Sequence, residues 1–169
     1  MNSSSHLIAF SGYAGTGKTT LSKLMFSNWS GFLISTDELE KQMRFRSIKN
    51  AEEDKYPLAL FLLEQLLSQK QNVIFDGNLR CQKTRIQIKN ICEKMKARFS
   101  LIQCNCPENE AEKRISFRNF IYPGYYKDSA SYTYTQKLFE PIHEYPYLKL
   151  NTLQPTASCV QEIFQYIQN

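Results

Sequence analysis

Residues 12 to 19 read Gly-Tyr-Ala-Gly-Thr-Gly-Lys-Thr, which matches the pattern G-x-x-x-x-G-K-[ST] at every fixed position. Glycines at these places let the backbone turn tightly, so that successive N–H groups point inward at a phosphate. The lysine of such a loop reaches the β- and γ-phosphates, and the hydroxyl that follows it binds Mg²⁺. The stretch therefore predicts a phosphate-binding loop made of Gly12, Tyr13, Ala14, Gly15, Thr16, Gly17, Lys18, Thr19 and Thr20.

The sequence on either side of this loop supports the prediction. Residues 6–10 form a short apolar run that is typical of a buried strand. After the loop, Leu21, Leu24 and Met25 recur with the spacing of one helical face. A strand, a glycine-rich loop and a helix in this order are the context expected of a phosphate-binding loop, and they disfavour the alternative of a purely structural turn.

Length and charge limit the possible classes of protein. A chain of 169 residues is expected to form one domain, residues 1–169. The net charge of +5 favours anionic ligands but does not by itself indicate nucleic-acid binding. No apolar run approaches the 18 or so residues of a membrane span, and residues 1–5 lack the features of a signal peptide. We therefore expect no membrane association.

The cysteines point to a reducing compartment. The chain has five of them, an odd and scattered set that fits free thiols in the cytoplasm better than a disulfide framework. Cys104 and Cys106 are separated by one residue, and no matching pair of His or Cys follows them. This spacing argues against a zinc site.

Apolar runs alternate with helical patterns along the whole chain, which predicts a parallel sheet covered by helices on both faces. In such sheets ligands bind at the carboxyl ends of the strands, so the residues after each strand are the first candidates for chemistry. We expect strands near 6–11, 31–35, 71–76, 98–104 and 147–151, and helices near 17–28, 37–45, 56–69, 82–97, 107–120, 131–140 and 156–168.

Asp37 follows the second predicted strand and is a candidate general base. A carboxylate there could accept the proton of a substrate hydroxyl that attacks the γ-phosphate. The alternative is a structural role, because Thr36 or Asp37 could be the N-cap of the next helix. Different residues could fill the two roles.

Asp76 ends the third predicted strand and resembles the Walker B carboxylate, which holds Mg²⁺ directly or through water. The alternative is a simple turn, since Asp76-Gly77-Asn78 is also typical turn sequence. The distance from the phosphate-binding loop favours the metal-binding interpretation.

Arg114 and Arg118 follow the fourth predicted strand and lie four residues apart, so they project from one face of a helix. Two guanidinium groups on one face can hold phosphate oxygens. The alternative is a solvated face on which Arg114 pairs with Glu110. The tyrosine-rich stretch 120–135 that follows could be a mobile lid over the site, or it could simply pack on the edge of the domain.

Together these residues resemble the AAA-domain family of small P-loop kinases, which includes the kinase domain of phage polynucleotide kinase and the zeta toxins. The resemblance covers nearly the whole chain. It implies a three-layer α/β P-loop NTPase fold with a five-stranded parallel sheet of order 2-3-1-4-5, helices on both faces and a small lid at about 114–135. Two further segments, Asp128-Ser129-Ala130 and Phe139-Glu140-Pro141, resemble a stretch found in ATPase-like members of the family.

The resemblance also implies roles for single residues. Asp37 would be the catalytic base, and the acceptor-binding arginine of the next helix would be Arg44, with Arg46 as second candidate. Adenine would pack between the lid arginines and the loop near Gln154 and Pro155. The implied sets are Lys18, Asp37, Arg114 and Arg118 for catalysis, Asp37, Arg44, Asn78 and Arg85 for the acceptor, and Thr19 and Asp76 for the metal.

The sequence thus predicts an ATP- and Mg²⁺-dependent kinase that phosphorylates a hydroxyl of a small-molecule or nucleotide-like acceptor. Residues 41–60 match no acceptor-specific pattern, whether for gluconate, shikimate or adenylylsulfate, so the acceptor stays open. One alternative is a 5′-hydroxyl polynucleotide kinase, whose binding would depend steeply on salt. Another is a regulatory ATPase without an acceptor, which would hydrolyse ATP and form no phosphorylated product.

Overall fold

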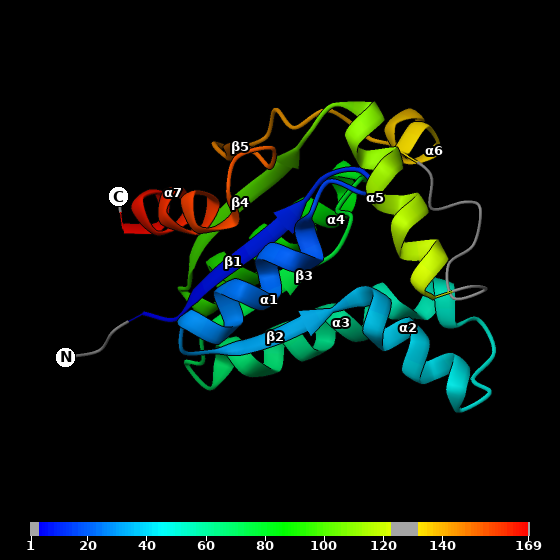
Figure 1. The fold of residues 1–169 in the computed structure, drawn as a ribbon. Coiled ribbons are helices and arrows are strands. Elements are labelled where there is room, and N and C mark those ends of the chain that lie inside the picture. Colours follow the sequence, from blue (N-terminus) through cyan, green and yellow to red (C-terminus); the bar gives the residue numbers. More distant parts are fainter. Residues whose placement is uncertain (1–3, 123–131, 169) are drawn as a thin grey trace.

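The computed structural model describes residues 4–122 and 132–168, and its centre is a parallel five-stranded sheet (Figure 1). The strand order is β2-β3-β1-β4-β5, so the predicted order 2-3-1-4-5 is confirmed. The strands are β1 (His6–Ser11), β2 (Phe32–Ser35), β3 (Val73–Asp76), β4 (Arg98–Asn105) and β5 (Leu148–Asn151).

Helices cover both faces of the sheet and the edge formed by the carboxyl ends of its strands (Figure 1). The three-layer architecture predicted from the sequence is therefore confirmed. The helices are α1 (Lys18–Asn28), α2 (Thr36–Phe45), α3 (Ala51–Ser68), α4 (Gln82–Met95), α5 (Glu108–Ile121), α6 (Tyr132–Lys137) and α7 (Thr156–Gln168).

The alternation of side chains along β1 explains the two cores. Leu7 and Ala9 point to a cluster shared with α3 and α4, whereas Ile8 and Phe10 point to a cluster shared with α1 and α7. All four side chains are fully buried. A strand buried on both faces reads as a continuous apolar run, which is why this segment shows no alternation in the sequence.

Register brings the ends of the central strands together. Asp76 of β3 pairs with Phe10 of β1 and with Ser35 of β2, so the three strands end side by side. The phosphate-binding loop starts directly after β1, and α2 starts directly after β2. This edge of the sheet therefore holds the loop, Asp76 and the first turn of α2 within one small region.

Two helices differ from the prediction. The helix expected at 56–69 begins earlier, at Ala51, because Asn50 precedes it as N-cap and acidic residues fill its first turn; Pro57 is accommodated inside it. The helix expected at 131–140 is shorter, since α6 ends at Lys137. A proline at 141 disfavours helical backbone at residue 140, whose N–H instead donates to the carbonyl of Arg80.

Among the described helices, none combines the length and the apolar character that a membrane crossing requires.

Candidate active site

The phosphate-binding loop connects β1 to α1 and touches two other elements closely. At Gly12 (φ 135°) an added Cβ would lie 2.5 Å from the carbonyl oxygen of Cys104, and at Gly15 (φ 76°) it would lie 2.5 Å from that of Ala111. A side chain fits neither position, so glycine is required for backbone conformation and for space. The loop is thus held directly against β4 and α5.

Lys18 is the first residue of α1, and its side chain lies almost fully inside the loop. Its ammonium donates to the carbonyl oxygen of Tyr13 at 2.6 Å. Burial lowers the pKa of Lys18, while the negative charges of Asp76 and Asp37 act to raise it. A cation in this sheltered place attracts an anion strongly, because little water screens it.

Asp76 lies at the end of β3 and is 3% exposed. Burial raises its pKa, and the charge of Lys18 together with a hydrogen bond from the Thr19 side chain opposes that shift. The hydroxyl of Ser35 lies 3.4 Å from its Oδ2 atom. A carboxylate and a hydroxyl oxygen side by side are ligands suited to Mg²⁺, which binds few protein groups and keeps several waters. Thr19 and Asp76 therefore fit the metal expected beside a triphosphate.

Asp37 lies in the first turn of α2 and is exposed. The N-cap of α2 is Ser35, so neither Thr36 nor Asp37 has the capping role that the sequence left open. The charge of Asp37 acts on both Lys18 and Asp76, which places it at the same edge of the sheet. An acidic side chain also suits the start of a helix, so this position has a modest structural benefit as well.

Arg114 of α5 borders a hollow beside the phosphate-binding loop. Its Nε donates to Glu110 at 3.0 Å, which is the ion pair expected from their spacing, and its Nη1 and Nη2 atoms reach the side chain and carbonyl of Thr152. We call this the nucleoside hollow; it is lined by Gly17, Thr20, Leu21, Arg114, Thr152, Thr156 and Cys159. The hollow lies between α1, α5 and the start of α7.

Arg118 lies one helical turn after Arg114 and is partly buried. Its positive charge acts to lower the pKa of Lys18. The structure therefore brings both Asp37 and Arg118 within electrostatic reach of Lys18.

Asn78 contacts the phosphate-binding loop through its backbone. Its carbonyl oxygen accepts from the N–H of Gly12 at 3.4 Å and from the hydroxyl of Ser11 at 3.2 Å. The chain after β3 is thereby tied to the loop after β1. The expected contact of Asn78 with an acceptor stays a prediction.

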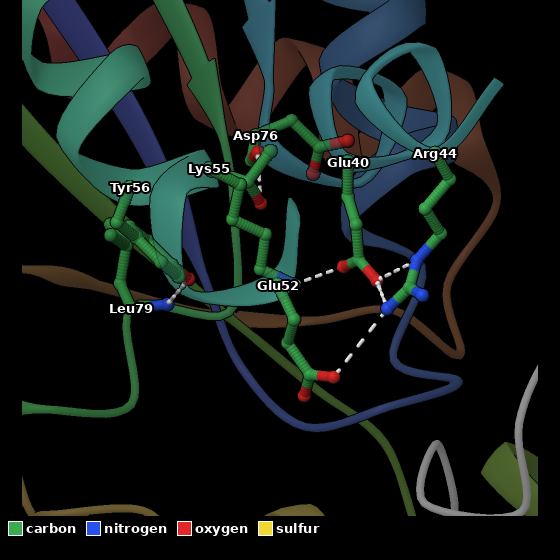
Figure 2. A network of polar contacts seen from close by, with 8 residues as sticks. Glu40, Arg44, Glu52, Lys55, Tyr56, Asp76 and Leu79 are labelled. Carbon is green, nitrogen blue, oxygen red and sulfur yellow. Dashed lines mark hydrogen bonds and ion pairs between the residues drawn. The ribbon is translucent and has the colours of Figure 1, made fainter. Parts of the chain in front are cut away.

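Arg44 belongs to a network of charges that joins α2 to α3 (Figure 2). Its Nη2 atom lies 2.6 Å from Glu40 and 3.6 Å from Glu52, and Glu40 also accepts from Lys55 at 2.6 Å. Partial burial acts to raise the pKa of Glu40, but the contacts with Lys55 and Arg44 outweigh it and lower the pKa. Binding of an acceptor by Arg44 would have to compete with these carboxylates.

Arg85 is fully buried and is the largest side chain of the interior. Its guanidinium donates to the carbonyl oxygens of Leu79, Arg80 and Pro141 and to the carboxylate of Glu144. These bonds hold the chain after α6 against the loop after β3. An acceptor-binding role for Arg85 stays a prediction, and it would require Arg85 to leave these partners.

The stretch expected to form a lid is described in part, since residues 123–131, including Asp128-Ser129-Ala130, lie outside the described ranges. Tyr132 packs edge-on against Tyr13 of the phosphate-binding loop, with ring centroids 5.1 Å apart. The hydroxyl of Thr135 accepts from the N–H of Ala14 at 2.9 Å. Tyr13 also packs against Phe139. The α6 region therefore contacts the loop that it was expected to cover.

Two residues near Asp37 had no role in the sequence analysis. Tyr56 of α3 places its hydroxyl 3.4 Å from the N–H of Leu79 (Figure 2). Arg80 follows Leu79 in the same connection between β3 and α4. Position after a strand could have pointed to Arg80, whereas Tyr56 lies in the 41–60 stretch, which matches no acceptor-specific pattern.

The fold and the loop together define a P-loop NTPase. The profile of an AAA-domain family matches residues 7–138, and the chain belongs to this family. A sequence comparison with curated proteins finds no match.

Solved structures share the fold over nearly the whole chain. A presumed kinase from Chloroflexus aurantiacus is 20% identical, with a TM-score of 0.79 over 97% of this chain and 99% of its own. A gluconokinase from Sinorhizobium meliloti is 16% identical, with a TM-score of 0.71 over 98% and 93%. The APS kinase of Mycobacterium tuberculosis, solved with AMPPNP and APS, is 14% identical, with a TM-score of 0.71 over 98% of both chains. At these identities the likeness concerns the fold.

Proposed function

We propose that this protein is an ATP- and Mg²⁺-dependent kinase that transfers the γ-phosphoryl group to a hydroxyl of a small-molecule or nucleotide-like acceptor. The observation that carries the proposal is the position of Asp37, an exposed carboxylate whose charge acts on both Lys18 and Asp76 beside the phosphate-binding loop. A protein that only binds ATP has no need of a base there, whereas an ATPase would use one to orient water, so the product of the reaction distinguishes a kinase from an ATPase.

Residues 12–20 hold the phosphates of ATP, and the nucleoside hollow takes its base and ribose. The hollow adjoins the loop at Gly17 and is bordered by Arg114, in agreement with the place that the family resemblance implies for adenine. The related fold of the Mycobacterium tuberculosis APS kinase contains AMPPNP, which supports a nucleotide at the corresponding place.

Thr19 and Asp76 hold Mg²⁺, since their oxygens lie together at the start of α1 and the end of β3. The ion supplies charge neutralisation at the β- and γ-phosphates when it is bound. Lys18, Arg114 and Arg118 add positive charge around the transferred group, and such preorganised charge accounts for most catalysis of phosphoryl transfer.

Asp37 orients the acceptor hydroxyl and receives its proton. The acceptor oxygen forms a bond to the γ-phosphorus as the bond to the bridging oxygen of ADP breaks, and the electron pair stays on ADP. The family resemblance implies Arg44, Asn78 and Arg85 as contacts of the acceptor, but Arg44 and Arg85 are each paired with glutamates in the structure. The whole chain would act as one catalytic domain, and its five free cysteines fit a reducing compartment such as the cytoplasm.

The test is phosphoryl transfer from γ-labelled ATP to panels of sugars, nucleosides, nucleotide-sugars, small hydroxy acids and 5′-OH oligonucleotides. We expect Asp37→Asn to lower kcat by roughly 10²–10⁴-fold, the usual contribution of a general base, with ATP binding in a calorimeter unchanged. Glu38→Gln is the matched control, because Glu38 is the next exposed acid of α2.

Three results would overturn or redirect the proposal. Full transfer by Asp37→Asn would remove Asp37 from the mechanism. Labelling of oligonucleotides alone would favour the polynucleotide kinase, and release of labelled phosphate without any labelled product would favour the regulatory ATPase.

A further inference from the structure

A second hollow shares no lining residue with the nucleoside hollow. It is lined by Tyr56, Leu79, Arg80, Cys81 and Thr84, and we call it the Arg80 hollow. It therefore lies between α3, the connection after β3 and the first turns of α4. Its volume is about 110 Å³, well below the roughly 300–1,000 Å³ of sites that enclose drug-sized ligands. The space suits one small group rather than a long chain.

Tyr56 connects this hollow to Asp37. Its hydroxyl accepts from the N–H of Leu79 and forms a hydrogen bond with the Thr36 side chain, the residue before Asp37. The charges of Asp37 and Arg80 both act on this hydroxyl. Tyr56 therefore lines the Arg80 hollow and is also hydrogen-bonded to the residue that precedes the base of the proposed kinase (Figure 2 shows Tyr56 and Leu79).

Arg80 is the cation of this hollow, and its side chain is partly exposed. Within residues 4–122 and 132–168, no carboxylate is paired with its guanidinium; only its backbone carbonyl is engaged, by Arg85 and by the N–H of Glu140. Arg44 and Arg85, by contrast, are bound to carboxylates of their own. Arg80 has its positive charge available for a ligand.

The acidic side chains that the structure describes near the hollow do not pair with the guanidinium of Arg80. The carboxylate of Glu140 accepts the N–H of Gln82 at the start of α4, so it is already engaged and also occupies this helix terminus. Asp37 acts on Tyr56 through its charge, and it does not line the hollow. The N–H of Gln82 is taken by Glu140, so Arg80 is the group of the hollow that can attract an anion.

We propose that the Arg80 hollow is the acceptor site of the kinase, and that Arg80, rather than Arg44 or Arg85, binds a carboxylate or phosphate of a small hydroxylated acceptor. That this site holds the acceptor of a kinase rests on the proposed function. The anion site itself can be tested without any kinase activity.

Cys81 offers the direct test, because it lines the hollow and is the one cysteine of the chain that is not buried. Its alkylation by iodoacetate, a small carboxylate, is compared with alkylation by neutral iodoacetamide and located by mass spectrometry. A change in the reactivity of the thiol itself alters both rates equally and cancels in their ratio. Arg80→Gln should lower this ratio by roughly two- to fivefold, as expected of one partly exposed charge pair.

Two variants control the test. Arg80→Lys keeps the charge and should keep most of the ratio, whereas Lys83→Gln removes an exposed charge close by in α4 and should leave the ratio unchanged. Circular dichroism confirms that each variant is folded. An unchanged ratio in Arg80→Gln, or an equal drop in Lys83→Gln, would overturn the anion site.

A second measurement distinguishes the two anions. With AMPPNP and Mg²⁺ filling the nucleotide site, inorganic phosphate and acetate are compared for protection of Cys81 from iodoacetamide. Stronger protection by phosphate indicates a phosphorylated acceptor, stronger protection by acetate indicates a hydroxy acid, and no protection by either counts against the site. If the anion site is confirmed while no acceptor is ever phosphorylated, the kinase proposal fails and the site stands alone.

Discussion

The guanidinium of Arg85 and the carboxylate of Glu144 form an ion pair, with Nη2 and Oε1 2.9 Å apart, in which the arginine side chain is fully buried. The pair joins α4 to the segment that follows α6. Burial acts to raise the pKa of Glu144, but backbone N–H groups and Arg85 outweigh it and lower the pKa. The contact fixes the connection after β3, and that connection carries both Asn78 and Arg80.

Arg85→Ala should lower the free energy of unfolding by about 3–5 kcal/mol, since it leaves a largely buried carboxylate without its cation and the carbonyl oxygens of Leu79 and Pro141 without their guanidinium donor. Urea denaturation measures the loss. Lys89→Ala, a substitution of a half-exposed cation on the same helix, is the control and should cost less than about 1 kcal/mol. A similar small loss for both variants would contradict the structural role.

Gly15→Ala should destabilise the chain by about 1–3 kcal/mol or more, because positive φ is costly for alanine and the new Cβ would meet the carbonyl of Ala111. Gly17→Ala separates the two causes. Gly17 also has positive φ, but its added Cβ has ordinary contacts of 3.7 Å. Thermal denaturation should show the larger loss for Gly15→Ala, and equal losses would mean that the contact with α5 is unimportant.

Asp76→Asn should reduce the tightening of ATP binding by Mg²⁺, since the variant loses the buried carboxylate beside Thr19. Removing a group that only hydrogen-bonds to a metal ligand typically lowers metal affinity by about 10–100-fold, so the loss of Asp76 itself should lower it by at least that much. Calorimetry with Mg²⁺ and with EDTA separates the metal effect from binding of the phosphates themselves. An unchanged difference between the two conditions would exclude Asp76 from the metal site.

The lowered pKa of His6 predicts that the folded protein loses stability in acid. Burial and the charge of Arg98 lower its pKa from 6.5 to about 4, and its Nε2 lies 2.9 Å from the hydroxyl of Ser100. The unfolded chain therefore binds more protons than the folded chain between these values, so stability is complete above pH 6.5 and declines as pH falls toward 4. His6→Gln should flatten the decline measured by urea denaturation at several pH values, and His143→Gln, at an exposed site, should not.

The positions of the central strands were predictable because β1 and β3 are short, fully buried apolar runs followed by recognisable ligand motifs, whereas the strand order came from the family resemblance. Asp76, for example, marked the end of β3, and the glycine-rich loop marked the end of β1. The start of α3 was not predictable from periodicity. Pro57 looked like a first helical residue, whereas the acidic turn at 52–54 already belongs to the helix.

The locations of Asp37 and Asp76 near the phosphate-binding loop were predictable because both residues follow strands, and their roles stay predictions. It was less predictable for the arginines, because a guanidinium serves equally well for a ligand or for a buried carboxylate. Arg44 and Arg85 were expected to bind the acceptor, yet Arg44 is paired with Glu40 one helical turn earlier and Arg85 with Glu144, which is far away in the sequence. Only the three-dimensional arrangement shows that Arg80 has its charge unclaimed among the described residues.

The walls of the nucleoside hollow come from opposite ends of the chain: Gly17 from one, and Thr152, Thr156 and Cys159 from the other. During translation the phosphate-binding loop is made on the order of ten seconds before the wall that faces it, at ordinary rates of elongation. The hollow is incomplete on a nascent chain until residues 152–159 have been made. Any stabilisation of the folding chain by the base and ribose of ATP therefore follows synthesis of that segment.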